Sequence, residues 1–94
     1  MAALLREKRD EILELSAKYG AHHVRIFGSF ARGDERTDSD IDFLLEFEPT
    51  RSLLDHAGLT IELQQLLGRK VDIGTPSGLR AKYRDRILSE VVDL

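Results

Sequence analysis

The feature that most constrains the fold is the segment 40–47, in which apolar and other side chains alternate. Every second position is a large apolar residue: Ile41, Phe43, Leu45 and Phe47. Because successive side chains of a strand point to opposite faces, this pattern predicts a strand with one face in a core. Two aspartates, Asp40 and Asp42, lie on the opposite face.

These two aspartates work against local propensity, since Asp is among the poorest strand formers. At positions i and i+2 of a strand, both carboxylates point toward the same region of space. Two like charges held that close are unfavourable unless a cation lies between them, so the pair indicates a divalent-metal site. The residues alone leave open an alternative, in which Asp38 and Asp40 cap a turn and Asp42 lies on a solvated face.

A third acid, Asp72, stands between Val71 and Ile73. The alternation predicts a short strand whose acid points away from the core. If this strand lies beside segment 40–47, three carboxylates converge, and such hard oxygen ligands suit Mg²⁺, including a two-ion site. An exposed acid at a strand edge is the alternative interpretation.

A possible phosphate-binding loop, Gly28-Ser29, directly follows a predicted strand. Backbone N–H groups and a hydroxyl at the start of a helix can hold phosphate oxygens, and Arg32 could add a charge-assisted contact. The loop is not of the Walker A type, because Asp34-Glu35 stands where Lys-Ser/Thr is required. An ordinary turn is the alternative here.

The remaining pattern predicts alternating helices and strands. We expect helices over 2–19, 29–33, 52–67 and 79–92, and strands over 22–27, 40–47 and 71–73. This order predicts an α/β or α+β fold with a small mixed sheet flanked by helices. At 94 residues and 10.7 kDa, the chain is expected to form a single domain over 1–94.

The composition argues against several classes of protein. The net charge is −3, so we expect no general nucleic-acid binding. There is no cysteine, which excludes disulfides and thiolate metal sites. No apolar run approaches the roughly 18 residues of a membrane span, and the charged N-terminal segment does not resemble a signal peptide. The expected location is therefore the cytoplasm, without a membrane partner.

Other polar residues are weaker candidates. His22 and His23 are adjacent on a predicted strand, so they face opposite sides, and we expect one packed and one exposed. His56 is expected at the surface or an interface, and Leu44 beneath the last helix. Four cations are expected to spread over a solvated surface of that helix: Arg80, Lys82, Arg84 and Arg86.

In combination, three motifs resemble the DNA polymerase beta-like nucleotidyltransferase superfamily, and most of all its minimal bacterial branch (MNT). They are Gly28-Ser29-Phe30-Ala31-Arg32-Gly33, Ser39-Asp40-Ile41-Asp42-Phe43 and Val71-Asp72-Ile73. The resemblance implies that Asp40 and Asp42 hold two Mg²⁺ ions and that Asp72 completes the site. It also implies that Gly28 and Ser29 bind the β- and γ-phosphates of ATP, with Arg32 as a further nucleotide contact.

The resemblance further implies a partner. Minimal members are commonly encoded beside a HEPN-type RNase toxin, and the antitoxin is thought to transfer AMP from ATP to a tyrosine of that toxin. A hetero-oligomer with the toxin is then expected. Two alternatives stay open, namely an antitoxin that neutralises by binding alone and an enzyme that modifies a small-molecule hydroxyl.

Overall fold

Over residues 2–94, which the computed structural model describes, the chain forms one mixed sheet with the strand order β3-β2-β1-β4. The strands are β1 (Ala21–Phe27), β2 (Ile41–Phe47), β3 (Val71–Gly74) and β4 (Val92–Asp93). β1 is antiparallel to both β2 and β4, whereas β2 and β3 are parallel. The predicted mixed sheet is therefore confirmed.

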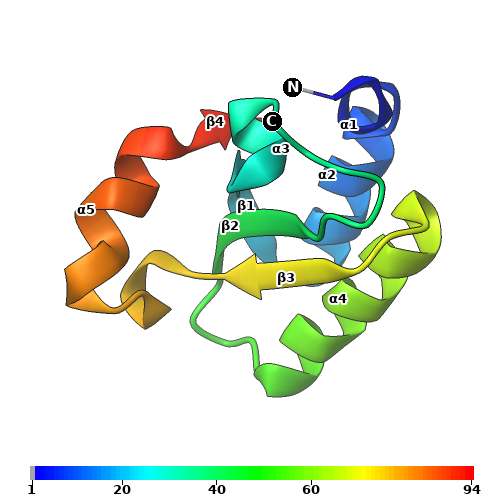
Figure 1. Cartoon of the computed structure of the whole chain (residues 1–94). Helices are drawn as coiled ribbons and strands as arrows, with labels where there is room; N and C mark the ends of the chain where they lie inside the picture. Colours follow the sequence, from blue (N-terminus) through cyan, green and yellow to red (C-terminus); the bar gives the residue numbers. More distant parts are fainter. Residues whose placement is uncertain (1) are drawn as a thin grey trace.

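The helices divide between two sides of this sheet (Figure 1). They are α1 (Ala3–Glu7), α2 (Arg9–Lys18), α3 (Ser29–Arg32), α4 (Leu53–Leu67), the 3₁₀ turn η1 (Pro76–Gly78) and α5 (Ala81–Glu90). α2 packs on β1, α4 packs on β3, and the two helices contact each other. α5 stands apart from them and leads from η1 back to β4 (Figure 1).

The core lies between the sheet and the pair α2 and α4. Its completely buried members include Leu5, Ile12, Ile26, Phe30, Ile41, Phe43, Leu45, Leu59 and Leu63. The alternation predicted for β2 is confirmed, because its odd-numbered residues from 41 to 45 all enter this core. The helical spacing of the leucines on α4 presents one apolar face in the same way.

Helix α4 begins and continues as its local sequence dictates. The Ser52 hydroxyl accepts a hydrogen bond from the Leu54 N–H at 3.2 Å, and the Asp55 carboxylate accepts one from the Ser52 N–H at 3.0 Å. These two reciprocal hydrogen bonds form a capping box. Gly58 in the helix interior has a packing reason, since a Cβ there would fall 2.6 Å from the ring of Tyr19.

The single helix predicted over 2–19 is wrong, because the structure breaks it at Lys8. That residue has φ −98° and ψ 7° and ends α1 while it precedes α2. The first residue of α2, Arg9, donates a hydrogen bond from Nε to the Leu94 carbonyl at 2.7 Å. The break therefore lies next to the contact between Leu94 and the start of α2. A local sequence pattern does not predict such a long-range contact.

The helix predicted over 79–92 is also shorter than expected. α5 ends at Glu90, Val91 is extended, and β4 pairs Val92 with Ile26 of β1. Two successive valines favour extended backbone, and the free edge of β1 supplies the hydrogen-bonding partner. The sequence prediction missed this strand. Within residues 2–94, no helix has the length and hydropathy of a membrane span.

Candidate active site

The strand register places Asp42 at the centre of the candidate site. In the parallel pair, Asp42 of β2 lies opposite Asp72 of β3, and in the antiparallel pair it lies opposite Phe27 of β1. All three belong to the sheet face that points away from α2 and α4. The condition set by the sequence, that the Asp72 strand lies beside segment 40–47, is therefore met, and two acids from distant parts of the sequence become neighbours.

The pKa of Asp42 is affected by the charges of both other predicted site acids, Asp40 and Asp72. The pKa of the Asp42 carboxyl is raised to about 6, mainly by burial and then by the charges of Asp72 and Asp40, while Arg32 acts in the opposite direction. Asp42 is half-buried, whereas Asp72 is exposed. Three carboxylates therefore share one electrostatic field whose repulsion a bound cation would relieve.

The donor set fits a hard divalent cation, although it is not a finished metal site. Among residues 2–94, no three acidic or histidine side chains already surround one point as a ligand set. Asp40 lies just before β2, and its Oδ2 is 3.9 Å from Nζ of Lys70. This solvent-exposed ion pair is weak enough to exchange for a metal ion. Carboxylate oxygens are the ligands that Mg²⁺ prefers.

The loop after β1 packs directly against these acids. Gly28 has φ +72° and ψ −152°, a conformation that favours glycine, and a Cβ at this position would overlap the Asp42 carboxylate. Its carbonyl accepts hydrogen bonds from the N–H groups of Ala31 and Arg32, both at 3.1 Å, as α3 begins. Ser29 opens this short helix, so its own N–H precedes the first intrahelical bond. The close approach explains why a glycine stands here.

Arg32 lies on the same loop and is bound by two acids. Its Nε donates to Asp34 Oδ2 at 3.2 Å, and its Nη1 donates to Glu90 Oε2 at 3.3 Å. These contacts, Asp34 first, raise the pKa of the Arg32 guanidinium. Arg32, the predicted nucleotide contact, therefore lies near the acids of the site, but its guanidinium already binds the carboxylates of Asp34 and Glu90.

A cavity of about 220 Å³ joins this loop to α5. Its lining consists of Phe27, Gly28, Arg32, Tyr83, Arg86, Ile87 and Glu90. Sequence reasoning assigned no functional role to the α5 residues, because it treated that helix as a solvated surface. A signal was present, since positions 83, 86, 87 and 90 recur at helical spacing and share one face.

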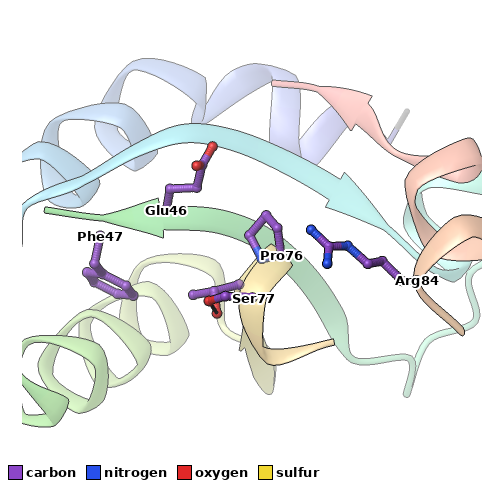
Figure 2. Close-up of a pocket in the computed structure, with 6 residues that line it drawn as sticks. Glu46, Phe47, Pro76, Ser77 and Arg84 are labelled. Carbon is purple, nitrogen blue, oxygen red and sulfur yellow. Dashed lines mark hydrogen bonds between the residues drawn. The ribbon is translucent and has the colours of Figure 1, made fainter. Parts of the chain in front are cut away.

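A second cavity, of about 400 Å³, lies at the other end of β2 (Figure 2). Figure 2 shows Glu46 and Phe47 leaving β2 in different directions, with Pro76 and Ser77 of η1 and Arg84 of α5 completing the lining together with Thr75. None of the predicted site residues lines it. The Phe47 ring stacks on His56, with the ring centroids 5.4 Å apart.

Leu44 of β2 and Arg25 of β1 lie opposite each other on the same sheet face as Asp42. Leu44 is fully buried and Arg25 is 8% exposed. The Leu44 and Leu79 side chains both border the space beside Gly74. Leu79 is the first residue of the helix predicted over 79–92, and in the structure it precedes α5.

The histidines play no part in the candidate site. His22 and His23 are both exposed, so the expectation that one of them packs is wrong. A register irregularity between His22 and Arg25, together with φ +52° at His23, explains why the alternation fails. The His23 Nδ1 lies 2.9 Å from Glu46 Oε2, and this hydrogen bond is the main cause of a lowered Glu46 pKa.

Comparison with known proteins gives consistent results. A family model described as a nucleotidyltransferase domain matches residues 5–94. The protein adenylyltransferase MntA of Thermococcus cleftensis is 38% identical over 97 residues, which cover 98% of each chain. A solved structure described as a minimal nucleotidyltransferase matches with a TM-score of 0.86 and 49% identity. The match covers 96% of this chain and 92% of the chain in that structure.

One further solved structure bears on the fold alone. It is described as a toxin–antitoxin with AMP-PNP, and its matching chain has a TM-score of 0.75 at 19% identity. The match covers 89% of this chain and 69% of the other. At this identity, the likeness is one of architecture.

Proposed function

Because this chain belongs to the nucleotidyltransferase domain family, we propose that it transfers AMP from ATP to a tyrosine hydroxyl of a partner protein. The observation that carries the proposal is the placement of Asp42 beside Asp72, with Gly28 packed against the Asp42 carboxylate. The relative from Thermococcus cleftensis, which is named a protein adenylyltransferase and matches nearly end to end, supports the choice of a protein acceptor.

In this proposal the acids bind metal and the loop after β1 binds phosphate. Asp40, Asp42 and Asp72 would hold divalent magnesium, with two ions in the complete site. Gly28 and Ser29 present backbone N–H groups and a hydroxyl to the β- and γ-phosphates. Bound magnesium would neutralise charge on the phosphates and on the departing pyrophosphate.

The reaction we propose is an in-line displacement. The tyrosine oxygen forms a bond to the α-phosphorus, the bond from that phosphorus to the bridging oxygen breaks, and pyrophosphate leaves with that oxygen. Asp72, which is exposed at the open face, accepts the phenolic proton. The protein contributes mainly by orienting the acceptor and by stabilising developing charge.

We propose a HEPN-type RNase toxin as the acceptor, with this chain acting as its antitoxin in a hetero-oligomer in the cytoplasm. The open position of Asp72 supports an acceptor that is itself a folded protein, since a large substrate can reach it. The toxin–antitoxin structure with the same fold is compatible with such an assembly.

A second candidate is an antitoxin that neutralises by binding alone. It is favoured by the apolar residues exposed on α4, where Leu53 is 84% exposed, Leu54 83% and Ile61 54%. Exposed apolar surface of this kind is typical of a protein interface. The two candidates predict different behaviour for a variant that folds but lacks catalytic charge.

Co-expression of the partner in cells separates these candidates. Wild type, Asp42→Asn and the control Asp38→Asn are compared at equal abundance, since Asp38 is an exposed acid outside the site. The catalytic proposal expects rescue of growth by wild type and by Asp38→Asn, and no rescue by Asp42→Asn. Full rescue by Asp42→Asn would instead establish neutralisation by binding.

A further inference from the structure

One carboxylate, that of Glu90, lies between two guanidinium groups at the mouth of the cavity beside Gly28. Its Oε2 is 3.3 Å from Nη1 of Arg32, and its Oε1 is 3.7 Å from Nε of Arg86. All four residues line the same cavity of about 220 Å³. An anion thus occupies a position where two arginines and a glycine loop converge.

The Glu90 side chain is partly buried, at 26% exposed, but the helix that carries it is loosely packed. No residue of α5 is buried, and the Arg86 side chain is 76% exposed. Both arginine partners are largely exposed to solvent, and ion pairs of solvated cations contribute about 0–1 kcal/mol, so the pairs can exchange for a ligand of higher charge. The helix can therefore keep its place while Glu90 leaves the two arginines.

We propose that Arg86 is a second phosphate-binding residue of this enzyme, and that Glu90 occupies the place of a nucleotide phosphate until ATP binds. This inference rests on the proposed function and deepens it, because it adds an α5 residue to the nucleotide site. Guanidinium groups bind carboxylate and phosphate oxygens with the same fork geometry. A triphosphate carries several negative charges against one on Glu90, so it displaces the carboxylate.

The charges around Arg32 favour a second cation in the nucleotide site. Arg32 is also bound by Asp34, so a phosphate there meets a cation that is already partly neutralised. Once Glu90 is displaced, Arg86 supplies a second positive charge to the same cavity from α5. The two arginines, on α3 and α5, would then hold the nucleotide between them.

The same helix offers a matched control in Arg84. It is two residues from Arg86 and is also exposed, but it lines the other cavity, with Glu46 and Phe47 (Figure 2). Loss of either arginine changes the net charge equally. A difference between the two variants therefore reports position and not charge.

The test is the affinity of the full chain for a nonhydrolysable ATP analogue with Mg²⁺, measured by isothermal titration calorimetry. We expect Arg86→Ala to weaken binding by roughly tenfold, the size of one charge-assisted contact. Arg84→Ala should stay within about twofold of wild type, as expected for an exposed charge outside the site. Glu90→Gln should tighten binding by about two- to fivefold, because it removes the competing anion.

Two results would overturn the inference while leaving the proposed function intact. One is equal affinity of Arg86→Ala and Arg84→Ala. The other is weaker binding by Glu90→Gln, which would mean that Glu90 organises the site and does not compete for it. Failure of wild type to bind the analogue would overturn both this inference and the proposed function. Circular dichroism melts check that each variant is folded.

Discussion

The two faces of β2 come from the same seven residues, yet they are built for different purposes. On one face, Ile41, Phe43 and Leu45 are fully buried against the core. On the other face, Leu44 is also fully buried, but Asp42 is only half-buried beside Asp72, and the neighbouring helix α5 has no buried residue. The comparison shows that the core face of β2 supplies most of the buried apolar surface. The opposite face can therefore carry carboxylates that repel each other, beside a helix that is loosely packed.

The strongest way to break this comparison is a large cavity in the core face. Phe43→Ala removes a fully buried ring from β2. We expect the free energy of unfolding to fall by about 3–5 kcal/mol, because transfer and cavity terms add. Urea denaturation measures the change, and a loss below about 1 kcal/mol would contradict the assignment of this face to the core.

The next largest effect is expected at the loop that contacts Asp42. In Gly28→Ala, the new Cβ meets the Asp42 carboxylate, and the backbone is held in a region that favours glycine. We expect a loss of about 1–3 kcal/mol in stability together with loss of AMP transfer.

Gly33→Ala is the matched control for this loop. Gly33 also has a positive φ, of +81°, but its Cβ would meet open space. Its cost should be the smaller one, near 1 kcal/mol, with transfer retained. Equal effects of the two variants on transfer would show that the contact with Asp42 is unimportant.

Removing the charge of Asp42 should stabilise the metal-free protein. Its raised pKa means that the folded state holds this proton more tightly than the unfolded state does, so stability falls as pH rises from about 3.8 through about 6. Asp42→Asn lacks this penalty. In EDTA we therefore expect it to exceed wild type at pH 7.5 by on the order of 1 kcal/mol, a value reduced by solvent screening.

The pH dependence provides the check on that prediction. The advantage of Asp42→Asn should disappear below about pH 4, where the wild-type carboxyl is protonated in both states. Thermal melts across this range measure it. A constant difference at all pH values would mean that packing or hydrogen bonding, and not charge repulsion, sets the effect.

The smallest effect is expected on α5. Ile87 is only partly buried there, so Ile87→Ala should cost less than about 1 kcal/mol. Ile12→Ala in α2 is the matched core variant, because Ile12 is fully buried, and it should cost about 2–5 kcal/mol. Similar losses from the two isoleucines would show that α5 belongs to the cooperative core.

Sequence reasoning succeeded where a local period reports a burial pattern. The alternation in β2 predicted its core face. The proximity of Asp42 and Asp72 was inferred only on the condition that their strands are neighbours, and the structure supplies that pairing. It failed where distant segments decide the structure, as at Lys8 and in β4, where Val92 pairs with Ile26. The α5 residues of the cavity were missed because exposed charges on a helix resemble an ordinary solvated surface.

The central claim is that AMP transfer to a partner protein requires the negative charge of the Asp42 carboxylate. The most direct measurement is the intact mass of the protein encoded beside this gene, after incubation with this chain, ATP and Mg²⁺. The account predicts a gain of one or more AMP units with wild type and with Asp38→Asn, and none with Asp42→Asn or in EDTA. A stable complex without any gain in mass, or an equal gain with Asp42→Asn, would contradict it.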